Sequence, residues 1–173
     1  MTAELDSPAL RAALMENYSL YAEGLDSKNW PLVRSCFADE VNIDYGSISD
    51  PSGSPDVARA SDEWLNVLQS VINGFDITRH TITNHRFGFD EELVSCRAYL
   101  IADHVIFPNP ELPIISDADV ATVIGEYTNH FAQTADGWKI RRSKLVINYS
   151  RGNLDLFGVA AERVAEQLGA QQA

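Results

Sequence analysis

The feature of this 173-residue chain that most restricts its fold is a change of hydrophobic period after Gly74. Beyond that residue, apolar and polar side chains alternate in four long runs that are separated by short polar or proline-rich breaks. A period of two is typical of strands that bury one face, and short breaks join such strands as antiparallel neighbours. The pattern predicts strands at about residues 76–89, 93–107, 120–132 and 138–149.

The segment before Gly74 shows helical spacing instead. Ser7 and Pro8 are typical of a helix start, and apolar residues then recur every three or four positions to about residue 26. The other expected elements are a helix at about 29–37 capped by Asp26 and Ser27, a strand at 41–46, a loop at 47–55, and helices at about 57–72 and 154–168.

Helices that come first and antiparallel strands that follow predict an α+β fold. Helices gathered on one face of a curved antiparallel sheet leave a cone-shaped cavity, which suits a small-molecule pocket. Neither a repeat nor a linker divides the sequence. We therefore expect a single domain over residues 1–173, with a core of about 8–150 followed by the C-terminal helix.

Charge and composition exclude several functional classes. Thirteen Lys and Arg against 25 Asp and Glu give a net charge of −12, which repels nucleic-acid backbones and anionic membranes. Apolar runs fall far short of the roughly 20 residues of a membrane helix, and residues 1–20 lack the apolar core of a signal peptide. Cys36 and Cys96 show no metal-binding spacing, so we expect reduced thiols, no metal and a cytoplasmic protein.

Asp26 and His80 are the most informative titratable residues. Asp26 ends the first helix on its apolar stripe, where it either caps the next helix or points inward to hold a histidine. His80 lies in the middle of a predicted strand, and an imidazole held by a carboxylate is a good base near neutral pH. A metal site of Asp26, His80 and His104 is less favoured, because an Asp–His hydrogen bond uses the same groups more simply.

Aromatic side chains are expected around the same cavity. A phenol near the base can polarise a carbonyl or protonate a leaving oxygen. Tyr21 is best placed, because it lies little more than one helical turn before Asp26. His104 alternates onto the predicted cavity face, whereas His85 and His130 look more exposed. The expected substrate-contacting set comprises His104, Trp64, Tyr127 and Tyr149, and Tyr45 joins Tyr21 as a catalytic candidate.

Four stretches, taken in order, resemble the SnoaL-like branch of the nuclear-transport-factor-2-like superfamily. They are Tyr21–Trp30, Phe37–Tyr45, Arg79–Asn84, and Tyr127–Phe131 with Asp136–Ile140. Within that branch the likeness is to the scytalone dehydratase, bile acid 7α-dehydratase and hexachlorocyclohexane dehydrochlorinase enzymes. The resemblance implies a cystatin-like cone and a homo-oligomer, either a trimer or a dimer.

The resemblance also implies roles for particular residues. Asp26 and His80 match the branch's catalytic dyad, Tyr45 and His104 match substrate-contacting residues, and Tyr21 matches an active-site tyrosine. The expected function is a lyase of dehydratase type that needs no cofactor and acts on a small, largely apolar cyclic substrate. Two alternatives stay open: an isomerase or cyclase that uses the same base, and a non-catalytic binding or subunit module.

Overall fold

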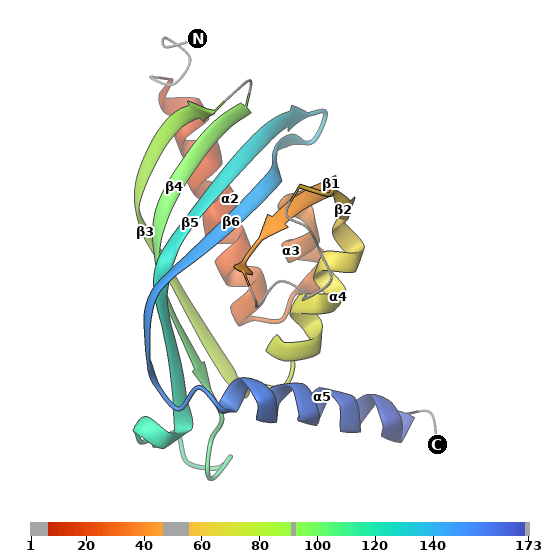
Figure 1. Ribbon diagram of the computed structural model, residues 1–173, viewed down its shortest axis with the longest axis vertical. Helices are drawn as coiled ribbons and strands as arrows, with labels where there is room; N and C mark the ends of the chain where they lie inside the picture. The colour runs from red at the N-terminus through yellow and green to blue at the C-terminus, as the bar shows by residue number, and fades with distance from the viewer. Residues whose placement is uncertain (1–6, 47–55, 91–92, 172–173) are drawn as a thin grey trace.

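A computed structural model describes residues 7–46, 56–90 and 93–171 and confirms the α+β class (Figure 1). The loop expected at 47–55 and part of the turn after Asp90, Glu91 and Glu92, lie outside the described residues. The elements are α2 (Pro8–Asp26), α3 (Trp30–Ser35), β1 (Phe37–Asp44), β2 (Arg59–Ala60), α4 (Ser61–Ile72), β3 (Ile77–Asp90), β4 (Leu93–Val105), the 3₁₀ helix η2 (Asp117–Asp119), β5 (Val120–Thr134), β6 (Gly137–Gly152) and α5 (Leu156–Gln171).

The strands form one six-stranded sheet in the order β2-β1-β6-β5-β4-β3. The long strands β3 to β6 are antiparallel neighbours, as their alternation predicts. The expectation of a wholly antiparallel sheet is wrong at β1, which pairs in parallel with β6, Asn42 lying opposite Arg142. A parallel pair needs a long connection, which α4 and the three intervening long strands supply, so local patterning carries no sign of it.

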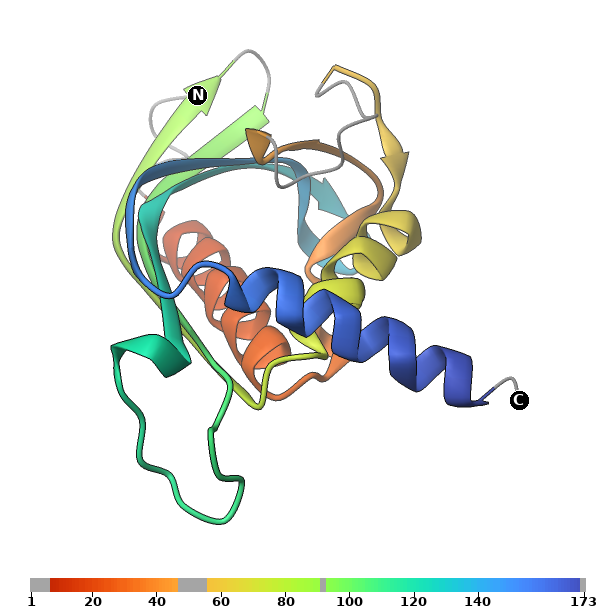
Figure 2. The same cartoon turned by 60° about the horizontal axis from the view of Figure 1, so that its bottom comes forward.

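Bulges bend the long strands into a cone. Strand β3 shifts register against β4 around Asn84, whose φ is 57°, and β6 shifts against β5 between Ile124 and Gly125. Such irregularities increase the local twist and curl a sheet. A Cβ on Gly125 would lie 2.3 Å from the Val146 carbonyl oxygen, so this bend requires glycine. Figure 2 shows the resulting sheet curving around the helices.

Helix α2 lies against the concave face of the sheet (Figure 1). Ser7 caps it by accepting the Leu10 N–H, and Pro8 takes the first helical position. The apolar stripe expected from the spacing is buried along the whole helix.

Among the described residues no helix is both long and apolar enough to cross a membrane.

The start of α3 differs from the sequence expectation. Its N-cap is Asn29, whose side chain accepts a backbone N–H of the first turn, and not Asp26 or Ser27. The chain turns sharply before it, with Lys28 at a φ of 55°. Because Asn29 caps the helix, the carboxylate of Asp26 is available for other partners.

Helix α5 crosses the open end of the cone (Figure 2) and is held there by a close approach. Ala160 is fully buried in a small apolar cluster with Phe75, Ile106 and Leu156. A Cβ added to Gly74 would lie 1.9 Å from the Ala160 carbonyl oxygen. The junction between α4 and β3 therefore touches the backbone of α5 and leaves no room for a side chain.

We expect the Gly74→Ala variant to lose about 1–3 kcal/mol of unfolding free energy, because backbone atoms must move to admit the methyl group. Gly158→Ala, within α5 itself, is the matched control. Nothing lies within 4 Å of a Cβ there, and alanine favours a helix by about 1 kcal/mol over glycine. Urea denaturation of both variants checks this; equal stability of the two would contradict the close packing.

Candidate active site

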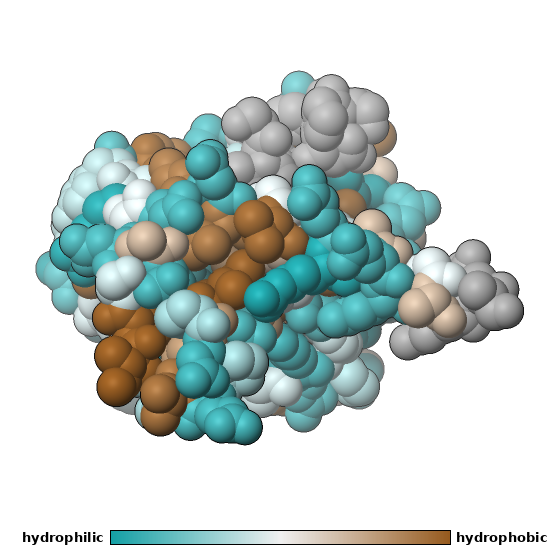
Figure 3. Space-filling model, turned by 90° about the horizontal axis from the view of Figure 1, so that it is seen from below, coloured by the Kyte–Doolittle hydropathy of each residue, from teal (hydrophilic) through white to brown (hydrophobic). Residues whose placement is uncertain are grey.

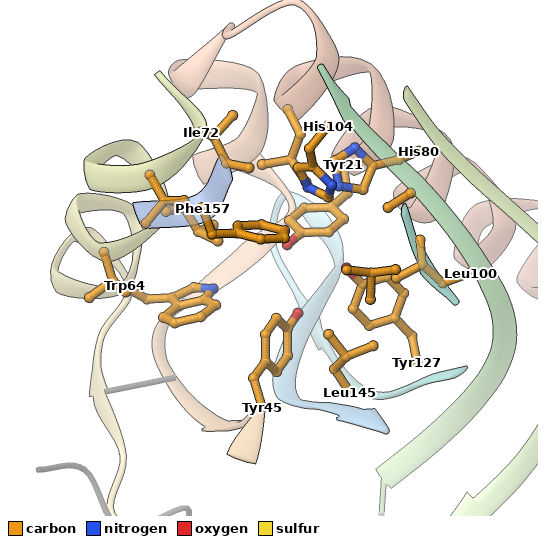
Figure 4. Close-up of a pocket in the computed structure, with 16 residues that line it drawn as sticks. Tyr21, Tyr45, Trp64, Ile72, His80, Leu100, His104, Tyr127, Leu145 and Phe157 are labelled. Atoms are coloured by element: carbon orange, nitrogen blue, oxygen red, sulfur yellow. The ribbon is translucent and has the colours of Figure 1, made fainter. Parts of the chain in front are cut away.

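The concave sheet face and residues of α2, α4 and α5 border a cavity of about 390 Å³ (Figure 4). That volume is in the range of small-molecule pockets. Apolar and aromatic side chains make up most of its wall, and none of the described residues that line it is Lys, Arg, Asp or Glu. The expected site residues that line the cavity are Tyr21, Tyr45, Trp64, His80, His104 and Tyr127.

Asp26 and His80 form the hydrogen-bonded pair expected from their positions. His80 Nδ1 lies 2.7 Å from Asp26 Oδ1, and the His80 backbone N–H donates to Oδ2 at 3.0 Å. Thr78, two residues before His80 and on the same face of β3, donates its hydroxyl to Oδ1 at 2.9 Å. The carboxylate thus receives three donors from β3, which fixes the imidazole both at its ring and at its backbone.

Electrostatics keep the Asp26 carboxylate ionised. Partial burial raises the pKa of Asp26, but hydrogen bonds and charge attraction from His80, together with the Thr78 hydroxyl, outweigh it and hold the pKa below its usual range. An ionised carboxylate accepts hydrogen bonds only, so the proton between the two groups belongs to His80 Nδ1. His80 Nε2 is then the basic nitrogen of a ring that lines the cavity.

His104 lies edge-on to His80, with ring centroids 5.5 Å apart. Its Nδ1 lies 3.3 Å from the Ala121 carbonyl oxygen, which can only accept, so Nδ1 carries the hydrogen. Burial, and next the nearby His80, lower the pKa of His104 to about 4. His104 is therefore a neutral ring at neutral pH, and its Nε2 is a hydrogen-bond acceptor rather than an acid.

This buried histidine makes the fold sensitive to acid. The unfolded chain protonates His104 below about pH 6.5, whereas the folded chain resists protonation until the pKa of about 4. We therefore expect the stability that neutral His104 contributes to be complete above pH 6.5 and to fall by about 3 kcal/mol in total as the pH drops from 6.5 to 4. Urea denaturation across this range, compared with His104→Phe, checks it; the same pH dependence in both proteins would contradict the assignment.

Three buried phenols meet at the centre of the cavity. Tyr21, Tyr45 and Tyr127 hydrogen-bond one another, and burial raises the pKa of each, so all three keep their protons. The Tyr45 hydroxyl also lies 3.0 Å from Ser143 Oγ, which donates to Asn129 Oδ1 at 2.7 Å. Because Ser143 has only one hydroxyl hydrogen, Tyr45 must be the donor to Ser143. Tyr45 accepts in turn from Tyr21 and Tyr127, so without a ligand the hydrogens of all three phenols are used within this cluster and with Ser143.

Sequence reasoning missed several residues of this arrangement. Thr78, Asn129 and Ser143 are polar side chains that are almost fully buried. Each falls on the inward face by strand alternation, and a polar residue on such a face was the available signal. Phe157 of α5 also lines the cavity, with its ring 4.8 Å from that of His104. The last helix therefore contributes to the cavity wall and not only to packing.

Tyr149 does not belong to the site. Its side chain is 61% exposed and does not line the cavity. Simple alternation from Leu145, which faces inward opposite Tyr127, would place it inside. The register shift pairs Ile147 with Gly125 but Tyr149 with Ile124, so one extra residue turns Tyr149 to the outer face.

Trp64 is where the sequence expectation placed it, on the cavity wall. Its side chain is 1% exposed, and its ring meets that of Tyr45 edge-on at 5.0 Å. A search of the described ranges finds no group of three His, Cys, Asp or Glu that could hold a metal ion. The polar side chains among the described lining residues are imidazole, phenol and indole groups.

A conical α+β fold around an apolar cavity, with His80 in the cavity wall and Asp26 hydrogen-bonded to it, is typical of the nuclear-transport-factor-2-like type. A family model described as the SnoaL-like domain matches residues 7–144. The chain belongs to this SnoaL-like family. The resemblance noted from sequence is thereby confirmed.

Solved structures agree with this assignment. Protein Kfla4162 of Kribbella flavida is 27% identical with a TM-score of 0.71, over 90% of this chain and 99% of that one. A candidate scytalone dehydratase of Novosphingobium aromaticivorans is 18% identical with a TM-score of 0.61, over 83% and 91%. The hexachlorocyclohexane dehydrochlorinase LinA-type3 of Novosphingobium barchaimii is 17% identical with a TM-score of 0.65, over 87% and 94%. A search of curated proteins gives no significant match.

Proposed function

We propose that this protein is a cofactor-independent lyase of dehydratase type that acts on a small, uncharged, mostly apolar ring compound. The observation that carries the proposal is the 2.7 Å contact that Asp26 makes with His80, whose ring lines an apolar cavity. Membership of the SnoaL-like family supports it, as do structural neighbours with the names of a dehydratase and a dehydrochlorinase.

The proposed reaction starts at His80. Nε2 takes a proton from the carbon next to an activating carbonyl, and Asp26 stabilises the imidazolium that forms. The electrons of the broken C–H bond form the new double bond as hydroxide leaves from the neighbouring carbon. The imidazolium gives its proton to that hydroxide, so water leaves and His80 returns to its starting state. Tyr21 and Tyr127 keep their protons, and either hydroxyl polarises the carbonyl as a hydrogen-bond donor once it turns from Tyr45 to the substrate.

The wall composition supports the substrate class. An anionic substrate would need a cation to balance its charge in a site shielded from water, and the described lining residues include neither Lys nor Arg. The net charge of −12 further disfavours the approach of anions. Aromatic and branched aliphatic side chains instead favour an uncharged ring.

An isomerase or cyclase is the second candidate function. It is supported by the same geometry, because the proton held on His80 can return to a different carbon instead of leaving with hydroxide. The Asp26–His80 pair serves both reactions equally, so the identity of the product separates them.

The experiment is to incubate the protein with cyclic β-hydroxy ketones in D₂O and to follow products by mass spectrometry. Loss of water supports the lyase. In a second reaction with cyclic β,γ-unsaturated ketones, a double bond that moves into conjugation without loss of water, with deuterium gained at carbon, supports the isomerase. Binding of these ketones without either change would contradict a catalytic role and leave the non-catalytic ligand-binding module.

We also propose that the chain forms a homo-oligomer. The outer sheet face exposes Tyr99, Ile101, Val146 and Tyr149, and burial of such a row between copies would remove apolar surface from water. Figure 3 shows further apolar side chains at the lower end of the molecule, where the segment between β4 and β5 exposes Leu112, Ile114 and Ile115. Light scattering of the purified chain measures the oligomeric state.

A further inference from the structure

The indole N–H of Trp64 is a buried donor without an acceptor among the described residues. Trp64 is 1% exposed and lines the cavity, yet its Nε1 atom meets no hydrogen-bonding partner there. Its neighbours on the same helix that share the cavity wall, Val67, Leu68 and Val71, offer no acceptor in their side chains. A buried donor left in this condition costs about 1–3 kcal/mol, so such groups are rare unless something else supplies the acceptor.

Other polar groups of the cavity do not satisfy this donor. The Tyr45 oxygen, nearest in ring contact, already receives hydrogen bonds from Tyr21 and Tyr127. The two histidines lie on the other side of the cavity from Trp64 (Figure 4). By contrast, Trp30 donates its own Nε1 hydrogen to Asn73 Oδ1 at 3.1 Å. The fold thus pairs one indole donor with a protein acceptor and leaves the other at the cavity.

We propose that Trp64 Nε1 is the anchoring donor for a carbonyl oxygen of the substrate, at the opposite end of the cavity from His80. This inference rests on the proposed function, because it takes the same cavity as the substrate site. It adds that the ring compound carries an acceptor oxygen remote from the carbon that loses its proton.

The chemistry of the two ends narrows the ligand further. An indole N–H is only a donor, so the atom that it meets is an acceptor, and an ammonium or amide N–H is excluded from that position. At the other end, His80 Nε2 and His104 Nε2 are both acceptors, which suits a hydroxyl group of the ligand. A cyclic compound with the β-hydroxy ketone group at the histidine end and a second carbonyl oxygen at the Trp64 end satisfies both.

The test uses two ligands of similar shape, 1-tetralone and tetralin, which differ in the carbonyl oxygen. The indole N–H signals of the ¹⁵N-labelled protein are assigned with the Trp30→Phe and Trp138→Phe variants, since the chain has three tryptophans. We expect 1-tetralone to move the Trp64 signal downfield as the new hydrogen bond forms. The Trp30 signal, already bonded to Asn73, should stay in place, and tetralin should cause no downfield shift.

Binding affinity gives a second readout. Removal of one uncharged hydrogen bond lowers affinity by about three- to tenfold. Trp64→Phe should therefore lower the affinity for 1-tetralone by that factor, while the affinity for tetralin stays nearly the same. If this variant does not fold, the chemical shift of the Trp64 indole N–H in the native chain is sufficient to test the proposed hydrogen bond.

The outcomes separate the anchor from the proposed function. If 1-tetralone and tetralin both bind without moving the Trp64 signal, the anchor is wrong and the cavity remains a ligand site. If neither compound binds, the cavity does not take small ring compounds, and both proposals fail. If the Trp64 signal already has the position of a bonded indole without ligand, an ordered water is the acceptor and the inference is overturned.

Discussion

We expect the His80→Ala variant to lose proton-abstraction activity by about 10²–10⁴-fold, the range that a general base contributes. The imidazole is the basic group that Asp26 orients in the cavity wall, and the phenols cannot replace it because burial holds their protons in place. The measurement is the rate of deuterium incorporation beside the carbonyl of 2-tetralone in D₂O, which needs no knowledge of the natural substrate.

The chain provides a matched control for this experiment. His130 also pairs with an aspartate, its Nε2 lying 2.8 Å from Asp90 Oδ2, but it sits on the outer face and does not line the cavity. His130→Ala should leave the exchange rate unchanged. His80→Gln, which can still donate to Asp26, guards against misfolding. Equal losses in the His80 and His130 variants would show that the loss has a structural cause and would sink the base assignment.

We expect the Asp26→Asn variant to lose about 10²-fold or more in the same assay, because the isosteric amide disturbs the proton of His80. If the amide NH₂ takes the position of Oδ1, it faces Nδ1, and the ring must place its hydrogen on Nε2 and lose its basic atom. If the NH₂ takes the position of Oδ2, it opposes the His80 backbone N–H, which donates there now. Either orientation breaks one of the present hydrogen bonds.

The same variant should change stability in a pH-dependent way. The lowered pKa of Asp26 means that its ionised form stabilises the fold above the ordinary carboxyl range, and that this stability is lost as the pH falls through the lowered value. The difference between native chain and variant, about 1–3 kcal/mol for an unpaired buried donor, should therefore shrink in acid. Asp90→Asn is the control. If Asp26→Asn loses stability but keeps its exchange rate, Asp26 has a purely structural role.

Local patterning predicted the elements and many side-chain directions. Helix α2 and the long strands lie within a few residues of their expected bounds, because a buried face imposes its own period on the sequence. The same alternation predicted His104 on the cavity face, and His104 lines the cavity. These predictions required only the identity of near neighbours along the chain.

Alternation gave a wrong side-chain direction where a register shift adds one residue to a strand. Tyr149 was expected inside, but the unpaired residue between it and Ile147 turns it outward. The parallel pairing of β1 with β6 could not be predicted from local patterning either, because β6 lies far along the chain. Register shifts and distant pairings depend on which backbone groups meet in space, and the period of a single strand contains no record of them.

The sequence by itself determined which residue types the site contains and where they lie along the chain. It left Asp26 as either a helix cap or a histidine partner, and it placed Trp64 near substrate without giving its donor a role. Only the tertiary structure decided these points. Asn29 caps α3 and β3 brings three donors to Asp26, while Trp64 Nε1 meets no acceptor in the described residues. Hydrogen bonds between distant segments depend on ångström-scale geometry, which is fixed only when sheet and helices pack together.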